Sequence, residues 1–381
     1  MADLTPENYW PLGSTVQETT ILTNGVKQYE HFGLISVNPT NGYSVIFYRG
    51  GNSHVGSNDY GIIYLRYSTD GGSTWSYPES VVVSEANVDL RNLGGGYDNT
   101  GKLFIFYARY FPGHPNQKPP IPTQWLSMNY LYSINDGQTW NAGSVLSTMS
   151  QNWYSPYGQI IDAGNDVLYQ TWYAGSGSTY KLYLYKSING GTSFSSVIDI
   201  NPNPPHNTNL VLTESSMVNL GGGCFLLLVR YDTKINNYFY YYQFKSEDNC
   251  VTWQNQGITS FEGLSSNYSA PPYLSFINYE GVGIVACYYT NRGTQKLNVV
   301  FGLAKDLLDN GPISWNASTI KEVLSYNSDL FSGYQSFFHP INQYKGIGVC
   351  FKEAVSNSIA YPVIVFTNIS GMKNVLVALG L

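Results

Sequence analysis

The stretch Ser68-Thr-Asp-Gly-Gly-Ser-Thr-Trp75 decides the fold of this chain, because variants of it return at Ser133–Trp140, Ser187–Phe194 and Ser246–Trp253. The Asp of such a stretch can bond the backbone two residues further on, and a Gly takes the positive φ that a tight turn requires. The closing Trp offers a large apolar surface that can pack beneath the turn. We therefore expect each copy to be a turn that pins a β-hairpin and carries no chemistry.

The later copies depart from the first in ways that favour a structural role. Asn135 and Asn189 replace the Asp, Ser193 and Phe194 replace the Thr-Trp pair, and Cys250 replaces the second Gly. A turn tolerates such changes better than a set of catalytic groups would. The pattern S-x-D-x-G-x-T-W is the Asp-box, and here it resembles the repeats of the sialidase superfamily.

The spacing of the copies predicts a repeat architecture. They end at residues 75, 140, 194 and 253, at intervals of 65, 54 and 59 residues. A propeller blade of four strands occupies ~40–50 residues, or more with long loops, and 381 residues at a period of about 60 give six blades. A degenerate further copy is expected between Asp306 and Trp315. We predict an all-β, six-bladed β-propeller of four-stranded antiparallel sheets, with the Asp-boxes opposite the ligand pocket.

Local patterning agrees with strands and with one domain. Short segments rich in β-branched and aromatic residues, bounded by Gly, Asn and Asp, include 61–67, 102–107 and 180–185. Helical periodicity is not evident over any long run. A closed ring is one cooperative unit and no linker divides the chain, so residues 1–381 are expected to form a single domain. The proline-rich stretch 112–122 predicts a surface loop.

The composition favours a ligand that is half hydroxyl and half hydrocarbon. Charged residues make up 12% and aromatic residues 15% of the chain, which contains 34 Tyr. Tyr and Trp combine an apolar face with a polar edge and so suit sugars, although β proteins also use Tyr on their strands. The formal net charge is −6 without a basic cluster, so neither nucleic acid nor an anionic membrane is an expected partner.

Location and cofactors are predicted from what the sequence lacks. There is no run of ~18 apolar residues to span a membrane, and the first residues lack the basic and apolar regions of a signal peptide. We expect no membrane insertion and a cytoplasmic or virion-associated protein. Cys224, Cys250, Cys287 and Cys350 lack C-x-x-C spacing, which favours buried free thiols over a disulfide frame or a zinc site. Neither a cofactor nor a metal is expected.

Sialidases bind the substrate carboxylate with three arginines, attack with a Tyr whose base is a Glu, and use an Asp as the acid. The most specific match is the segment 213–230, in which Glu214 begins one apolar hairpin and Arg230 ends it. The resemblance implies that Glu214 is the base and Arg230 the second arginine, against the alternative of a surface ion pair. The segment Ser332-Gly-Tyr-Gln-Ser336 looks like the one that carries the nucleophile, which would be Tyr334.

A tyrosine nucleophile needs help at neutral pH. The unperturbed phenol has a pKa of about 10, so an adjacent carboxylate must take its proton. We therefore expect the Tyr334 and Glu214 oxygens within ~2.6–3.2 Å of each other. A carboxylate nucleophile would be repelled by the carboxylate of the substrate, and sialidases are an exception to the two-carboxylate rule of glycosidases.

The first blade should supply an arginine and the acid. Arg49 precedes the first Asp-box as the first arginine of the family does, although the usual Arg-Ile-Pro is here Arg-Gly-Gly. The resemblance implies that Arg49 binds the carboxylate and that Glu353 orients it, and the alternative is a strand-end arginine paired with a neighbouring acid. Two candidates remain for the acid, Asp59 and His54, which share the loop that follows.

Two further positions are less sharply defined by the resemblance. Asp89 and Arg91 lie two residues apart, so on a strand they point to one face and either pair or line the pocket. The third arginine of the family corresponds to Arg292, which comes slightly early, or to Lys296 on the following strand.

Three hypotheses follow. The first is a sialidase-like retaining exo-glycosidase that acts on terminal sialic acid or a related acidic sugar. The second is a non-catalytic glycan-binding propeller, such as a phage virion or tail receptor-binding protein, which the Tyr, Asn and Gly content resembles. The third is a structural propeller of a virion or homo-oligomeric assembly, which leaves the combination of Glu214, Arg230 and Tyr334 unexplained.

Overall fold

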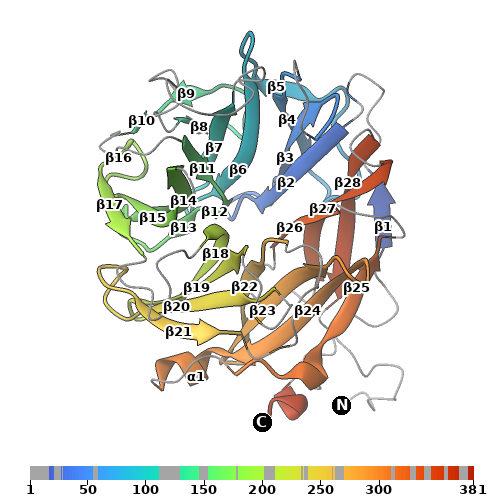
Figure 1. The fold of residues 1–381 in the computed structure, drawn as a ribbon. Coiled ribbons are helices and arrows are strands. Elements are labelled where there is room, and N and C mark those ends of the chain that lie inside the picture. Colours follow the sequence, from blue (N-terminus) through green and yellow to red (C-terminus); the bar gives the residue numbers. More distant parts are fainter. Residues whose placement is uncertain are drawn as a thin grey trace.

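The described residues form six blades that close into a ring around a central axis, with blades 1 and 6 linked by a single parallel bridge between Tyr29 and Ala360 (Figure 1). The computed structural model describes residues 17–20, 27, 29–54, 59–110, 129–145, 153–176, 179–200, 211–232, 235, 239–259, 261, 270–309, 314–326, 332–338, 345–355, 359–368 and 376–381. The prediction of an all-β, six-bladed propeller is confirmed. The proline-rich stretch 112–122 lies outside the described residues, so its expected surface position stays a prediction.

The first three blades follow one another along the chain, each with its first strand nearest the axis. Blade 1 contains β2 (Tyr29–Val37), β3 (Ser44–Gly51), β4 (Ile62–Ser68) and β5 (Ser80–Val83). Blade 2 contains β6 (Asp89–Tyr97), β7 (Leu103–Tyr110), β8 (Asn129–Ser133) and β9 (Asn141–Ala142). Blade 3 contains β11 (Trp153–Pro156), β13 (Ile161–Asp162), β14 (Leu168–Ser176), β15 (Thr179–Ser187) and β17 (Ser196–Asp199). Between them, β12 (Gly158–Gln159) pairs in parallel with β6, and β10 (Ser144–Val145) pairs with β16 (Ser193–Phe194).

The last three blades repeat this order. Blade 4 contains β18 (Leu212–Gly221), β19 (Cys224–Tyr231), β20 (Tyr241–Ser246) and β21 (Gln254–Ile258). Blade 5 contains β22 (Tyr273–Tyr279), β23 (Val282–Asn291), β24 (Lys296–Leu303) and β25 (Lys321–Ser325). Blade 6 contains β26 (Gly333–Phe338), β27 (Lys345–Val355) and β28 (Ile359–Asn368), with β1 (Gln17–Thr20) as its outermost strand. The ring is thus closed by an N-terminal strand that pairs antiparallel with β28.

All four Asp-box copies form one and the same turn, between the third and fourth strands of blades 1 to 4. In the first copy, Ser68 Oγ accepts the amide hydrogen of Gly72 at 2.8 Å, and Asp70 accepts that of Thr74 at 2.9 Å. The three later copies make the equivalent bonds. The Asp or Asn therefore bonds the backbone four residues on and not two, because the Ser hydroxyl occupies the nearer amides.

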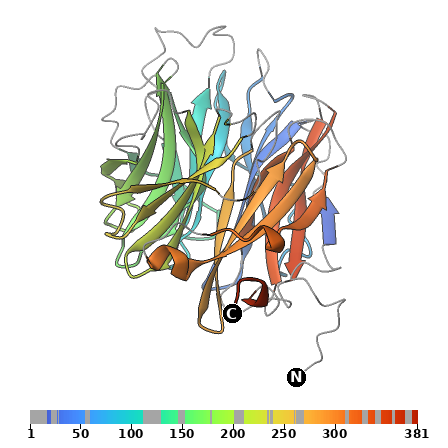
Figure 2. The same cartoon turned by 60° about the horizontal axis from the view of Figure 1, so that its bottom comes forward.

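The turns and the candidate site lie at opposite ends of the strands. In blade 1, Ser68 of the turn faces Ser44 at the start of β3, whereas Arg49 lies near the end of β3. The antiparallel register therefore separates them by the length of a strand. In blade 5 the helix α1 (Ala304–Leu308) takes the place of a box turn after β24, where the sequence predicted a degenerate copy, and it lies outside the strands in Figure 2.

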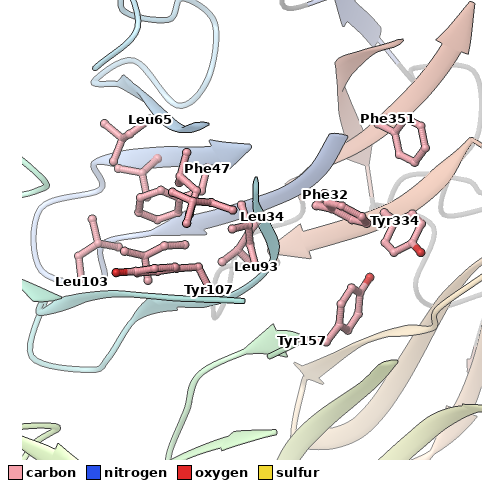
Figure 3. Packing of buried hydrophobic residues seen from close by; sticks show 14 of the residues in the cluster. Phe32, Leu34, Phe47, Leu65, Leu93, Leu103, Tyr107, Tyr157, Tyr334 and Phe351 are labelled. Carbon is pink, nitrogen blue, oxygen red and sulfur yellow. The ribbon is translucent and has the colours of Figure 1, made fainter. Parts of the chain in front are cut away.

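The core consists of apolar side chains packed between neighbouring blades. One cluster runs from blades 1 and 2 to the axis, where Phe32 and Tyr157 lie beside Tyr334 (Figure 3). Burying one such side chain contributes about 1.5–3 kcal/mol, so this packing gives the candidate site a rigid floor. The four cysteines are buried free thiols, as predicted. Among the described residues, no helix has the length and apolar character needed to cross a membrane.

Candidate active site

Irregularities in the innermost strands mark the site. The pairing register shifts near the start of β2, β6, β18 and β26, as expected of β-bulges. Three residues at these places have positive φ, namely Phe32 at 58°, Asn92 at 45° and Tyr334 at 50°. Such a conformation costs about 1–3 kcal/mol for a bulky residue and is typical of functional sites. The bulges therefore concentrate backbone strain at one end of the axis.

Tyr334, Glu214 and Arg230 meet at this end. The Tyr334 hydroxyl donates to Glu214 Oε1 at 3.1 Å, within the expected range. Arg230 Nη1 donates to Glu214 Oε2 at 2.5 Å and lies 3.4 Å from the Tyr334 oxygen. Arg230 Nε is in turn held by Asp232 at 2.8 Å. Three of the residues matched to the sialidase family thus form one hydrogen-bonded group from blades 4 and 6.

The electrostatics keep Tyr334 protonated when the site is at rest. Burial and the negative charge of Glu214 raise the pKa of Tyr334 to about 12, although Arg230 and Arg292 act in the opposite direction. At neutral pH the phenol therefore carries its proton and donates it toward Glu214. A carboxylate in this position can accept the proton when the phenol oxygen forms a new bond.

Arg292, and not Lys296, belongs to this group. Its guanidinium lies over the Tyr334 ring at 5.8 Å, and its Nε donates to the carbonyl of Ser332 at 3.2 Å. Lys296 pairs instead with Glu322 on the outer part of blade 5, where both side chains are more than 40% exposed. Of the two candidates for the third arginine, Arg292 is therefore the one that lies beside Tyr334.

Arg49 is fully buried beside two aspartates. Its side chain is 0% exposed, and its Nη2 contacts Asp89 at 2.6 Å and Asp59 at 3.1 Å. A Cβ atom on Gly51 or Gly61 would come within 2.3 Å of the Arg49 guanidinium. The departure from Arg-Ile-Pro to Arg-Gly-Gly therefore leaves space for Arg49 to fold back against its own strand. In this arrangement Arg49 pairs with neighbouring acids, as the alternative interpretation had it.

Asp59 and His54 are both poorly suited to donate a proton. Asp59 is 3% exposed and accepts the amide hydrogens of Asn52 and Ser53 at 2.8 and 2.9 Å. Burial favours its neutral form, but these amides and Arg49 outweigh that effect and lower the pKa of Asp59. Burial, followed by the positive charge of Arg91, lowers the pKa of His54 to about 3. At neutral pH Asp59 is therefore ionised and His54 is neutral.

Asp89 bridges two arginines. Its Oδ1 accepts Arg49 Nε at 2.7 Å and the Gly61 amide at 2.9 Å, while its Oδ2 pairs with Arg91 Nε. We call Arg49, Asp59, Asp89 and Arg91 the arginine–aspartate network. The network joins blades 1 and 2, and two positive charges in it balance two negative ones. Of the two outcomes that the sequence allowed for Asp89 and Arg91, pairing is what the structure has.

Glu353 has a different partner from the one expected. Its Oε1 accepts the hydroxyl hydrogen of Tyr29 at 2.9 Å, and its amide donates to Ser332 Oγ at 3.1 Å. The contacts that orient Arg49 come from the arginine–aspartate network, so the expectation that Glu353 orients Arg49 is replaced by a Tyr29–Glu353 pair. The Tyr29 ring also stacks on His54, with their centroids 5.8 Å apart.

Several residues of the site carried no recognisable signal in the sequence. Asn92 donates to the Tyr173 hydroxyl at 2.7 Å, which joins blades 2 and 3 beside the axis. His31 is 0% exposed, and neither of its ring nitrogens has a hydrogen-bond partner. The places of these side chains depend on bulges and on contacts between blades, which no local sequence pattern predicts. Within the described ranges, no group of three or more His, Cys, Asp or Glu side chains could hold a metal ion.

Comparison with known proteins places the fold. No protein-family model matches the sequence, and neither does any curated protein. A protein of unknown function from Dyadobacter fermentans superposes with a TM-score of 0.70 at 13% identity, covering 93% of this chain and 98% of that one. Trypanosoma rangeli sialidase in complex with sialic acid gives 0.66 at 14% identity, covering 97% of this chain. The fold is sialidase-like.

A leech intramolecular trans-sialidase, solved with 2,7-anhydro-Neu5Ac, extends the comparison. It superposes with a TM-score of 0.68 at 12% identity, covering 94% of this chain and 71% of that one. The present chain spans only 61% of the length of the Trypanosoma sialidase. At these identities the likeness establishes the propeller fold, and chemistry must be argued from the side chains.

Proposed function

We propose that this protein is a sialidase-like retaining exo-glycosidase that acts on terminal sialic acid or a related acidic sugar. The observation that carries the proposal is the hydrogen bond of 3.1 Å from Tyr334 to Glu214, with Arg230 on the other carboxylate oxygen. A buried phenol next to a carboxylate is the arrangement that nucleophilic catalysis by Tyr requires. The positive φ of Tyr334 supports a functional role for this residue, because such strained conformations cluster at active sites.

The first step forms a covalent intermediate. The Tyr334 oxygen attacks the anomeric carbon, its proton passes to Glu214, and the glycosidic bond breaks with its electron pair on the leaving oxygen. Arg230 Nη1, 3.4 Å from the Tyr334 oxygen, stabilises negative charge on that oxygen before the bond forms. In the second step water attacks the anomeric carbon and displaces the Tyr334 oxygen, and Glu214 returns its proton to Tyr334. The proton that the water loses passes through solvent to the leaving-group oxygen, and the configuration of the sugar is retained.

Protonation of the leaving group is the weak part of this site. General acid catalysis typically contributes about 10²–10⁴-fold. At neutral pH Asp59 is ionised and His54 is a neutral imidazole, so neither is an effective proton donor. We therefore expect turnover of aryl glycosides, whose phenol leaving groups need little protonation. Natural glycosides should be cleaved much more slowly.

The same weakness favours a second candidate function, a glycan-binding propeller without turnover. Arg230 and Arg292 would still bind an acidic sugar in such a protein, and Tyr334 would serve as part of the floor. A virion or tail receptor-binding protein, alone or as a homo-oligomer, is the setting in which this function would operate. The lowered pKa values of Asp59 and His54, which leave both poorly suited to protonate a leaving group, support it.

One assay separates the two functions. The purified chain is incubated with an aryl sialoside that releases a fluorescent phenol, and with a natural sialyl-lactose. We expect measurable release from the aryl substrate, abolished in Tyr334→Phe, and slower cleavage of the natural one. Inertness toward both substrates, with sialyl-lactose binding retained, would support the binding protein instead.

A further inference from the structure

We propose that Arg91, and not Arg49, is the guanidinium of blades 1 and 2 that binds the acidic group of the sugar. This inference rests on the proposed function, because it assigns the recognition of the ligand at the same site. Arg49 acts through Asp89 and is a positioning residue. The sequence match to the sialidase family had given the carboxylate to Arg49.

Arg49 has no edge left for a ligand. Its side chain is 0% exposed, and all three of its nitrogens have protein partners, with Nη1 donating to the carbonyl of Ser53 at 3.2 Å. Both of its carboxylate partners are also buried, Asp59 at 3% and Asp89 at 1%. A ligand could reach this guanidinium only by breaking a buried ion pair, which is strongly destabilising when one partner is lost.

Arg91 has the opposite character. Its side chain is 15% exposed, and its Nε is held by Asp89 while its Nη2 donates to the carbonyl of His54 at 2.6 Å. The ring of Tyr110 lies 4.7 Å from the guanidinium carbon. Its Nη1 has no hydrogen-bond partner among the residues that the structure describes. The network thus fixes one edge of the planar guanidinium and leaves the other for an anion, at little cost in side-chain entropy.

Arg91 also lies close to other residues of the candidate site. It holds the backbone of His54, whose ring stacks on Tyr29, the partner of Glu353. After burial, the positive charges of Arg91 and then of Arg292 are the largest causes of the lowered pKa of His54. Arg292 in turn covers the Tyr334 ring. An acidic group bound by Arg91 and Arg292 would therefore lie beside His54 and within the group that contains the nucleophile.

Asp89 contacts both Arg49 and Arg91, which explains how carboxylate binding could pass from Arg49 to Arg91. Its Oδ1 serves Arg49 and the Gly61 amide, and its Oδ2 serves Arg91. Glycines at 51 and 61 provide the space in which Arg49 lies. The arginine of blade 1 has become the anchor of the arginine of blade 2.

The test compares Arg91→Gln with the wild type on two forms of one aryl sialoside, the free carboxylate and its neutral methyl ester. Arg109→Gln is the matched control, because Arg109 lies opposite Leu90 in the same blade and pairs with Glu85 at the surface. We expect Arg91→Gln to raise KM for the carboxylate by about 10- to 100-fold, the loss typical of one charged hydrogen bond. KM for the ester should stay within twofold, and Arg109→Gln should change neither.

The outcomes separate this inference from the proposed function. An equal change of KM for acid and ester, or no change for either, overturns the role of Arg91, even though hydrolysis that depends on Tyr334 still supports the glycosidase. A wild-type protein that neither cleaves nor binds the acidic sugar overturns both. Arg49→Gln provides a further check, because losing the fully buried partner of two carboxylates should lower the melting temperature more than Arg91→Gln does.

Discussion

The hydroxyl of Tyr334 donates to the carboxylate of Glu214, although the two residues are 120 positions apart in the chain. They come from the first strands of blades 6 and 4, which approach each other only at the axis. The pair therefore exists only when the ring is complete. This makes it a sensitive reporter of both fold and chemistry.

The first prediction concerns the base. Glu214→Gln keeps a hydrogen-bond acceptor near Tyr334 but cannot take its proton at the pH of the assay. We expect kcat for the aryl sialoside to fall by about 10²–10⁴-fold with little change in KM. Glu322→Gln, which removes a surface carboxylate paired with Lys296, should behave as the wild type. A Glu214→Gln enzyme with unchanged kcat would disprove the assignment of the base.

The second prediction concerns Asp59. An acid catalyst matters little when the leaving group is an acidic phenol, whereas a residue that positions the site matters for every substrate. Because Asp59 holds Arg49 and two loop amides, we expect Asp59→Asn to reduce hydrolysis of the aryl and the natural sialoside by similar factors. Loss confined to the natural substrate would identify Asp59 as the acid after all.

The third prediction concerns pH. His31 and His54 both have lowered pKa values, caused first by burial and then by neighbouring positive charges, Arg49 for His31 and Arg91 for His54. The unfolded chain binds protons at both histidines below about pH 6.5, whereas the folded chain does not. The free energy of unfolding is therefore unaffected by these histidines above pH 6.5. Below that pH it falls by about 1.4 kcal/mol per pH unit for each histidine.

Urea denaturation between pH 7 and pH 5 measures this slope before most carboxylates titrate. We expect His54→Gln to make the slope shallower, because one of the two groups is removed. A stability that is flat across this range in the wild-type protein would contradict the buried, neutral state of both imidazoles.

The fourth prediction concerns the turn of blade 2. Asp136 has a φ of 54° and accepts hydrogen bonds from Asn38 at 2.8 Å, Asn41 at 3.0 Å and Tyr97 at 2.8 Å. Asp136→Gly removes the backbone strain but leaves these donors without an acceptor. We therefore expect the free energy of unfolding to fall by about 2–4 kcal/mol. The matched control is Asn249→Gly at the same place in the blade 4 turn, with φ of 56°, which should be neutral or slightly stabilising. Thermal unfolding of both variants distinguishes the contributions.

The blade count and the grouping of Tyr334 with Glu214 and Arg230 could be predicted from the sequence because they depend on short segments of the chain. Each Asp-box turn is held by bonds within eight residues, so its pattern is visible in one stretch of chain. Glu214 and Arg230 flank a single hairpin, whose length fixes their relation. The position of Tyr334 then followed from resemblance to a segment of the sialidase family.

What could not be predicted depends on contacts between blades. The burial of Arg49 requires Asp59 and Asp89 from separate segments, and the Tyr29–Glu353 pair joins blades 1 and 6. A partial signal was present, because Gly51, which stands at the Pro position after Arg49, provides space that the folded-back side chain needs. The bulge at Phe32 left no comparable trace, since its strain is offset by packing from other blades.

The pairing of β1 with β28 also sets the order of assembly in the cell. Because blades 1 to 5 lie between Gln17–Thr20 and Ile359–Asn368 in the chain, β1 is synthesised well before its partner strand. Until then the sixth blade has an open edge, and both halves of the Tyr334–Glu214 pair are separated. The Tyr334–Glu214 pair should therefore form only after blade 6 has been synthesised, in one late event.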